Sequence, residues 1–446
     1  MIRHDEIIKP GPQHASRLKL EKTNILHFKN IILPFLLLLL IALSVDSTAQ
    51  QRFPMPEFES GYQHPEVSAP EPRSLALEYI DVLVLLAFLS VTSWLVIRKR
   101  SRKWILGLVV AALLYFGFWR NGCICPIGSV QNMALSFSDP GYAVSYTVIA
   151  FFMLPLLFSL GFGRVFCGTA CPLGAIQDLV IIRPVKVPAR VSKSLGMFPF
   201  VYLALAVLYA STGTGFVICR YDPFIGIFRM GAEFHLIVLG IAFLLAGMFV
   251  ARPYCRFVCP YGALLKVTSM FSKHHISITP SQCIECKLCS DSCPFGAIDR
   301  PVPERAISEM KGKTGHFMLY AAVIPLLMMA GGWALSSSHI FLSRAHPDVY
   351  LAHLLIDNPG VMDDTENLDV QTFLGSDRTM ESLVHDAEAI QAAFLRGSWI
   401  TGAFIGLVAG LFLVSQSIIR RRTGYHPNRG DCLSCGRCLK YCPVQK

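Results

Sequence analysis

Two runs of four cysteines carry the clearest chemistry in this sequence of 446 residues. Both have the spacing Cys-x2-Cys-x2-Cys-x3-Cys-Pro, in which three thiolates on one tight loop reach three irons of a cubane. The usual zinc pattern, two CxxC pairs separated by about 15–20 residues, is absent. The spacing predicts two [4Fe-4S] clusters, with eight ligands: Cys283, Cys286, Cys289, Cys293, Cys432, Cys435, Cys438 and Cys442.

Residues 294–431 separate the two runs, yet the runs are expected to pair. In two-cluster ferredoxins the fourth cysteine of each run ligates the cluster of the other run. The intervening segment holds two apolar stretches, so the chain leaves one face of a membrane and returns to it. The expected partition places one cluster on Cys283, Cys286, Cys289 and Cys442, and the other on Cys432, Cys435, Cys438 and Cys293.

The composition indicates a membrane protein. Hydrophobic residues make up 53% of the chain, charged residues only 16%, and the mean hydropathy is +0.48, which argues against a soluble or disordered chain. The net charge of +10 lies in short blocks beside apolar stretches, so it is interpreted as a topology signal and no nucleic-acid partner is expected. Eight apolar stretches occur, at roughly 31–45, 82–97, 104–119, 141–163, 195–217, 235–250, 317–342 and 398–419.

These stretches predict an all-α polytopic membrane protein with seven or eight transmembrane helices. A small ferredoxin-like α+β unit, split between an internal loop and the C-terminus, completes the fold. The expected segments are 1–49, a basic region with a signal peptide or a retained signal anchor; 50–77, a Pro-rich periplasmic strap; 78–270, the transmembrane core; 271–316 and 420–446, the cytoplasmic iron–sulfur segments; and 317–419, a helical hairpin.

Basic blocks place the iron–sulfur segments in the cytoplasm and the chain in the bacterial inner membrane. The opposite side holds the acidic loop 338–397. Within it, 376–395 has helical periodicity behind a Ser-Asp start. The loop is either a docking surface for a partner or an ordinary solvated loop.

The remaining seven cysteines form an internal repeat at helix ends. Its two copies cover about 123–174 and 219–262, each with an outer motif, a spanning helix and an inner CxxxCP motif. Three interpretations fit the inner cysteines: a third iron–sulfur cluster, redox-active thiol pairs, or buried cysteines. The inner set is Cys167, Cys171, Cys255 and Cys259, and the outer set is Cys123, Cys125 and Cys219.

The outer set offers only three thiols, so a cluster there needs a foreign ligand such as Asp222. A disulfide from Cys219 to Cys123 or Cys125 is the alternative in an oxidising compartment.

The two inner motifs resemble a known family. Arg164-Val-Phe-Cys167-Gly-Thr-Ala-Cys171-Pro-Leu-Gly-Ala and Arg252-Pro-Tyr-Cys255-Arg-Phe-Val-Cys259-Pro-Tyr-Gly-Ala, followed by a ferredoxin run, look like the NosR/NapH family of membrane polyferredoxins. The likeness covers roughly 80–300 and the last 15 residues. It implies electron transfer between the quinol pool, or a cytoplasmic donor, and a periplasmic reductase or flavoprotein. By this resemblance, the residues that would carry out that role are the four inner and the eight ferredoxin cysteines.

Two features depart from the family pattern. The segment 50–77 is too short for the flavin-binding domain of the nitrous-oxide branch, and the second ferredoxin run is displaced to the C-terminus. The expected role is relay rather than catalysis, as an electron-transfer subunit or quinol dehydrogenase component. A quinone is a candidate cofactor, while haem and covalent flavin are not expected. Candidate proton acceptors for a quinol are Asp81, Glu233 and His235, although the helix dipole alone favours acids at such helix starts.

Two rival functions belong to other classes. The first is a redox-sensing regulatory or assembly factor for a partner reductase, which the neighbouring genes would distinguish from a relay. The second is an alternating-access transporter, which the sequence disfavours because its apolar stretches contain essentially no buried charge.

Overall fold

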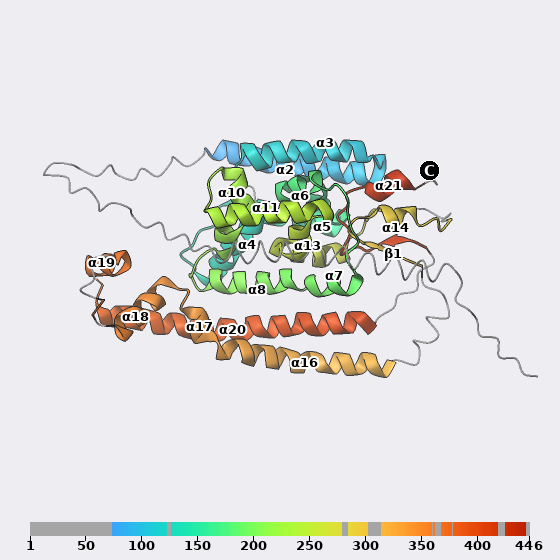
Figure 1. Ribbon diagram of the computed structural model, residues 1–446. Coiled ribbons are helices and arrows are strands. Elements are labelled where there is room, and N and C mark those ends of the chain that lie inside the picture. The colour runs from blue at the N-terminus through green and yellow to red at the C-terminus, as the bar shows by residue number, and fades with distance from the viewer. Residues whose placement is uncertain are drawn as a thin grey trace, which may run out of the picture.

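The computed structural model describes residues 74–122, 126–278, 284–301, 314–358, 360–361, 367–376, 378–417 and 424–442. Within these ranges the protein is mainly helical (Figure 1). The apolar stretch 31–45, with its signal peptide or anchor, lies outside the described residues, as does the strap up to residue 73. The strap was predicted to reach residue 77, but its last three residues already belong to helix α2 (Leu75–Trp94).

Four of the described helices are long and apolar enough to cross a membrane, or five if a pair bent by 105° counts as one span. The prediction of seven or eight spans also covers residues outside this part of the chain, and it stays a prediction. Two further apolar helical stretches have 10–17 residues. The four are Leu75–Lys99, Arg102–Trp119, Val191–Ser211 and Met380–Ser415; the bent pair is Pro223–Arg229 with Phe234–Phe249; the shorter two are Tyr146–Phe162 and Ala322–Ser337.

The first span consists of α2 and its π-helical continuation η1 (Leu95–Lys99), and the second of α3 (Arg102–Ala112) and η2 (Leu113–Trp119). The third combines α7 (Ala189–Leu195) with α8 (Phe198–Ser211).

The cysteine motifs lie on short helices between the longer ones. Four prolines of the repeat are each the first residue of a helix, a position that tolerates the missing N–H of proline. They are Pro126, Pro172, Pro223 and Pro260. The first copy comprises α4 (Pro126–Ser138), α5 (Tyr146–Phe162), η3 (Phe166–Ala170) and α6 (Pro172–Leu179). The second comprises α9 (Val217–Tyr221), α10 (Pro223–Arg229), α11 (Phe234–Phe249), α12 (Pro253–Phe257) and α13 (Pro260–Met270).

The two copies pack against each other, with α13 against α5 and α4 against α8. Cysteines of both copies belong to the main apolar core. The core is therefore built around the motifs rather than beside them.

The two ferredoxin-type runs come together at one end of the molecule (Figure 1). Helix α14 (Leu288–Ser292) of the first run packs against α21 (Arg437–Tyr441) of the second. Strands β1 (Ile298–Asp299) and β2 (His426–Pro427) pair antiparallel, with Ile298 opposite Pro427. Segments far apart in sequence thus share one small sheet.

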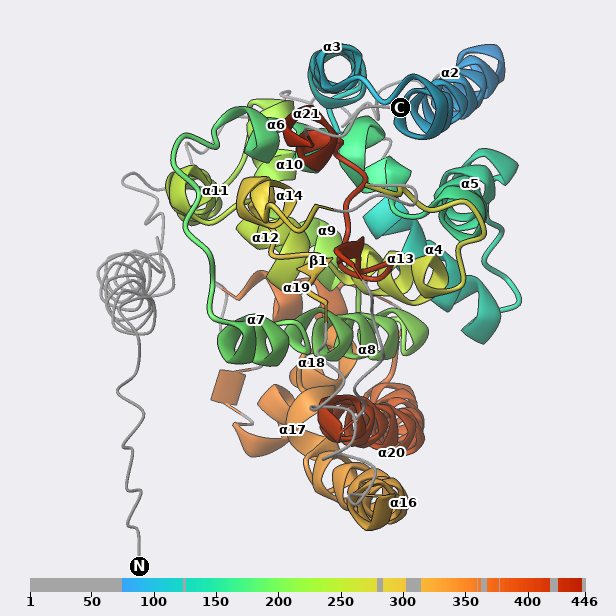
Figure 2. The ribbon, with the colours of Figure 1, turned by 90° about the vertical axis from the view of Figure 1, so that its right-hand side faces the viewer.

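A helical hairpin lies on the far side of α8 from α2 and α3 (Figure 2). Helices α16 (Thr314–Ser337) and α20 (Met380–Ser417) form it, and α20 contacts α8. The helices approach closely because Gly331 and Gly402 face each other, and a Cβ on either would overlap the partner backbone.

The acidic segment 338–397 was predicted to dock a partner or to be a solvated loop, and the loop interpretation is wrong. It folds into α17 (His339–Ser343), α18 (Pro347–Asp357), α19 (Leu368–Leu374) and the first part of α20. The helix expected over 376–395 begins at Met380. These elements bury their own apolar core, which explains their order: Val349, Leu355, Val370 and Leu383 are its centre.

Candidate iron–sulfur sites

The four inner cysteines gather in one buried place, the inner cysteine site. Cys167 lies in η3 and Cys255 in α12, while Cys171 and Cys259 are the residues just before α6 and α13. All four are at most 8% exposed. Burial raises the pKa of the Cys259 thiol far above its ordinary value, and the nearby thiols of the other three raise it further. The two CxxxCP motifs therefore meet.

The donor set of this site fits an iron–sulfur cluster. Four buried thiolates repel one another, and the positive iron core is what would let all four ionise together. Among the described residues, no three His, Cys, Asp or Glu side chains lie close enough to hold one metal ion; a tetrahedral zinc site needs sulfurs about 3.8 Å apart, whereas a cubane spreads its thiolates over four irons. Three N–H groups donate to the sulfurs: Arg164 to Cys167 (3.8 Å), Gln177 to Cys255 (3.4 Å) and Gly262 to Cys259 (3.3 Å).

In each copy of the repeat, an arginine contacts the cysteine motif of the other copy. Arg252 donates to the carbonyl of Cys167, and its Nη1 is 3.2 Å from where a Cβ of Gly174 would lie. Arg164 Nη2 is likewise 3.3 Å from the Cβ position of Gly262. The glycine of each Cys-Pro-x-Gly motif thus leaves room for the guanidinium of the other copy. Both arginines are buried, so two fixed positive charges face the four thiols.

Replacing Arg164 by glutamine is expected to lower the reduction potential of a cluster bound at the inner cysteine site. The variant removes one buried positive charge that favours the more negative, reduced cluster. We expect about 60 mV, a tenfold change for a one-electron couple. Redox titration followed by electron paramagnetic resonance (EPR) measures it. The exposed Lys273, changed to glutamine, removes the same charge and should leave the potential unchanged; equal shifts would refute the local effect.

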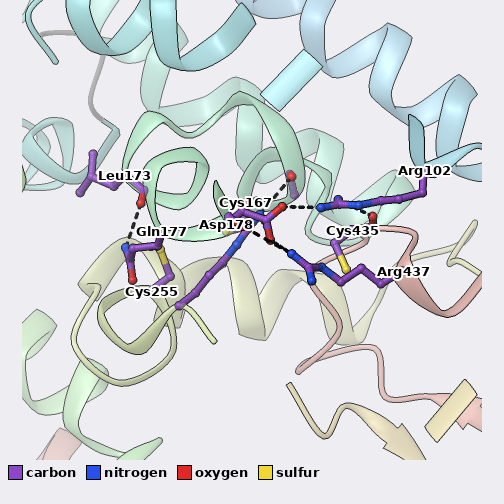
Figure 3. A network of polar contacts seen from close by, with 10 residues as sticks. Arg102, Cys167, Leu173, Gln177, Asp178, Cys255, Cys435 and Arg437 are labelled. Atoms are coloured by element: carbon purple, nitrogen blue, oxygen red, sulfur yellow. Dashed lines mark hydrogen bonds and ion pairs between the residues drawn. The ribbon is translucent and has the colours of Figure 1, made fainter. Parts of the chain in front are cut away.

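A buried carboxylate joins the inner cysteine site to the C-terminal ferredoxin run (Figure 3). Asp178 of α6 pairs with Arg102 (2.6 Å), Arg437 (3.0 Å) and Arg252 (3.3 Å), and its side chain is fully buried. Burial would raise the pKa of Asp178, but the three guanidinium groups hold it well below its usual value. Arg102 also donates to the carbonyl of Cys435 at 2.9 Å. Three segments that are distant in sequence therefore contact this one acid of α6.

The backbones of the two sites also touch. A Cβ on Gly168, in the loop between Cys167 and Cys171, would lie 2.6 Å from the carbonyl oxygen of Leu433. Leu433 lies between Cys432 and Cys435. Only a glycine permits this approach, so the loop of the inner site rests directly on the second ferredoxin run.

The fourth cysteine of the first run lies among the thiols of the second. Burial raises the pKa of Cys438 far above its ordinary value, and the thiols of Cys435, Cys432 and Cys293 raise it further. Burial, Cys435 and Cys293 likewise raise the pKa of Cys432 to about 12. These four side chains are the group expected for one cluster. Of the other predicted group, Cys283 lies outside the described residues, Cys286 is exposed, Cys289 is buried and Cys442 is half-buried.

The outer motifs are only partly described. Cys123 and Cys125 lie outside the described residues, and Cys219 belongs to α9. Asp222 caps α10 by accepting from the backbone N–H groups of Phe224 (2.8 Å) and Ile225 (3.2 Å). Its other oxygen accepts from the Tyr254 hydroxyl at 2.8 Å.

The candidate quinol residues differ in their surroundings. Asp81 is fully buried within α2, 2.8 Å from Arg120 Nε and 2.7 Å from the Tyr115 hydroxyl. Asp81 is six residues beyond Leu75, the first residue of α2, so the helix dipole does not explain it. The expectation that the spans contain essentially no buried charge is wrong. Glu233 is exposed before α11, with His235 Nδ1 3.3 Å from its carboxylate.

The sequence contained signals for the residues that were missed. Arg164 and Arg252 each precede the first cysteine of an inner motif by three positions, and this recurrence marks a shared role. Gln177 lies six residues after Cys171, as Gln131 lies six after Cys125. Asp178 had no such signal, because its three partners come from distant segments.

Family models match the two inner motifs and the first ferredoxin-type run. A "4Fe-4S binding domain" matches twice, at 144–190 and 233–279, so each match contains one inner motif. A second model, also described as a "4Fe-4S binding domain", matches 276–299. No solved structure matches the chain.

Several relatives match part of this chain. An uncharacterized protein of Methanocaldococcus jannaschii is 31% identical, over 41% of this chain and 77% of its own length. The regulatory protein NosR of Pseudomonas aeruginosa is 25% identical over 49% of this chain, which spans only 33% of that protein. The ferredoxin-type protein NapH of Escherichia coli is 24% identical over 45% of this chain and 75% of its own length.

Proposed function

We propose that this chain, which belongs to the NosR/NapH-type family of membrane ferredoxins, relays single electrons between the quinol pool or a cytoplasmic donor and a periplasmic reductase. The observation that carries this proposal is the direct contact between the inner cysteine site and the second ferredoxin run, through Gly168 and Leu433. Adjacent carriers are what stepwise electron transfer requires. Such a role does not require a set of catalytic residues that converts a substrate.

Three clusters are proposed, with iron–sulfur chemistry supplying uptake and release of one electron at each. The inner cysteine site would hold one, and the two ferredoxin-type runs would hold the other two. The chain itself provides the thiolates, the N–H groups that donate to sulfur, and a buried setting that excludes water. The proposed ligands are Cys167, Cys171, Cys255 and Cys259; Cys432, Cys435, Cys438 and Cys293; and Cys283, Cys286, Cys289 and Cys442.

The distribution of charge supports an orientation with the ferredoxin end in the cytoplasm. Arg102 contacts Cys435, and Arg100 Nη2 donates to the carbonyl of Ser277 at 2.6 Å, so this basic block lies at the ferredoxin end. Helices α18 and α19 lie at the opposite end (Figure 1). By the positive-inside rule, the proposed location is the inner membrane, with α18 and α19 in the periplasm.

A vesicle assay tests the relay. The full chain is reconstituted into liposomes that enclose ferricyanide, and dithionite is added outside under anaerobic conditions. Each electron taken from dithionite should leave one ferrocyanide inside, detected by the loss of ferricyanide absorbance. The variant Cys167→Ser with Cys255→Ser should lose this activity. If the wild-type chain reduces no ferricyanide, even with a quinone added to the bilayer, the relay is refuted.

The name of the Pseudomonas relative favours one second candidate, a redox-sensing regulatory role. Such a protein would bind clusters without supporting transmembrane electron flow. If the chain holds its clusters but the vesicles show no reduction of ferricyanide, the regulatory role would therefore be favoured over the relay.

A further inference from the structure

The residue that follows the first cysteine differs between the two inner motifs. Gly168 follows Cys167, whereas Arg256 follows Cys255. At the first of these positions a glycine is needed, because the carbonyl oxygen of Leu433 lies where a Cβ would be. The equivalent position of the other copy carries one of the longest side chains instead. The two copies of the repeat therefore meet the ferredoxin-type runs in different ways.

Arg256 contacts the end of the first ferredoxin-type run. Its Nη2 donates to the carbonyl of Phe295 at 3.1 Å and to the hydroxyl of Ser192, in α7, at 3.0 Å. Phe295 is buried and lies two residues after Cys293. The ring of Phe295 is also 5.9 Å from Cζ of Arg252, which is within the range of a cation–π interaction. Two arginines of the second inner motif thus hold the segment that follows Cys293.

The contacts of both copies lead to the same proposed cluster. Leu433 lies between Cys432 and Cys435, and Phe295 closely follows Cys293. These three cysteines belong to one proposed ligand set, named here the Cys293 cluster, which consists of Cys432, Cys435, Cys438 and Cys293. The inner cysteine site therefore contacts the Cys293 cluster from both of its halves.

The guanidinium of Arg256 retains a donor that no described residue satisfies. Its Nη1 is buried and has no hydrogen-bond partner among the described residues. Both acceptors of Nη2 are neutral, and a buried cation is costly unless an anion accompanies it. The carboxylate of Asp431 attracts Arg256, but it forms its ion pair with Lys266, at 2.8 Å.

The Cys293 cluster is an anion that suits this donor. Burial raises the pKa of the Cys293 thiol above its ordinary value and Cys435 raises it further, whereas the guanidinium of Arg256 lowers it. The charge of Arg256 therefore acts on this sulfur. An iron–sulfur cluster with four thiolate ligands is negatively charged, and its sulfurs accept hydrogen bonds that raise its reduction potential.

We propose that Arg256 is a positioning residue for electron transfer, which fixes Cys293 against the inner cysteine site and donates from Nη1 to a sulfur of the Cys293 cluster. The inner cluster then exchanges electrons with the Cys293 cluster, and the other ferredoxin-type cluster, whose ligand Cys286 is exposed, is the one that meets a cytoplasmic donor. One electron leaves one cluster as one enters the next, and no bond or proton changes. The inference rests on the proposed relay and deepens it, because it names the order of the carriers.

Redox titration of the full chain, purified anaerobically in detergent and followed by EPR, tests the role of Arg256. The signals of the Cys293 cluster are those that the variant Cys435→Ser lacks. In Arg256→Gln the potential of this cluster should fall by about 59 mV, a tenfold change for a one-electron couple, while the iron content stays that of the wild type. An unchanged potential would overturn the proposal.

Arg256→Lys separates the charge from the contacts. Lysine keeps the positive charge but lacks the planar fork of arginine, so it cannot hold Phe295 and Ser192 in the same way. The potential of the Cys293 cluster should stay near that of the wild type, while its magnetic interaction with the inner cluster should weaken. A potential as low as in Arg256→Gln would overturn the proposal. This variant also keeps the proposal testable if Arg256→Gln fails to fold.

Lys193→Gln is the matched control. Lys193 is exposed and follows Ser192 in α7, so the variant removes the same charge where solvent screens it. The potential should not change, and a shift equal to that of Arg256→Gln would contradict a local effect of the arginine.

Cys435→Ser separates this test from a failure of the relay. If Cys435→Ser loses iron while Arg256→Gln shifts no potential, only the role of Arg256 is refuted. If Cys435→Ser keeps all the iron of the wild type, the proposed function fails as well.

Discussion

Replacing Asp178 by asparagine is expected to destabilise the protein by about 3–5 kcal/mol, the usual cost of removing one partner from a buried ion pair. The variant leaves the guanidinium groups of Arg102, Arg252 and Arg437 near one another without their acid. The C-terminal ferredoxin run should then separate from α6, because Arg437 loses its anchor. The readouts are the thermal unfolding midpoint in detergent and the iron retained after purification.

The exposed pair of Lys186 and Asp291 is the matched control. Its atoms are 2.6 Å apart, but Asp291 is 62% exposed, and exposed pairs contribute only about 0–1 kcal/mol. Asp291→Asn should therefore change the midpoint and the iron content little. If both variants behave alike, the convergence on Asp178 does not stabilise the junction.

Gly168→Ala should disturb the junction between the sites from the other direction. Its added methyl group would overlap the carbonyl of Leu433, and overpacking of this kind costs about 1–3 kcal/mol. The loop bearing Cys432 and Cys435 would have to move away, so the magnetic interaction between the two reduced clusters should weaken. EPR spectra of the fully reduced protein report that interaction.

Gly161→Ala is the control for this variant. Gly161 lies near the end of α5, and a Cβ there would meet nothing within 4 Å. A helical Gly→Ala change of this kind is neutral or stabilising by up to about 1 kcal/mol. The spectrum should remain that of the wild type. An unchanged spectrum in Gly168→Ala as well would contradict the contact between the sites.

The parts predicted best from sequence are those with local signals. Cysteine spacing marked both ferredoxin-type runs, and the placement of Cys293 among Cys432, Cys435 and Cys438 follows from the rule that paired runs exchange their fourth ligand. The repeat of CxxxCP motifs was visible for the same reason. Apolar stretches located the helices, because hydrophobicity over a window is a local property.

Other features depend on contacts between residues that are distant in sequence, so they could not be predicted from the sequence. The length of α5 is set by a chain break at Gly163, which has a φ of 75°, a conformation that the apolar pattern does not reveal. The acidic segment after α16 folds because Val349 and Leu383 share a core, a contact that composition does not reveal. The burial of Asp81 depends on Arg120, a neighbour in space and not in sequence.

The most direct test of the central claim is the iron content of the double variant Cys167→Ser and Cys255→Ser, compared with the wild-type chain after anaerobic purification. If the inner cysteine site holds a cluster, the variant should contain about four fewer irons per chain while the ferredoxin-type cysteines keep theirs. Unchanged iron would mean that these four cysteines are redox thiols or core residues, and the proposed path from the ferredoxin end into the membrane would be contradicted.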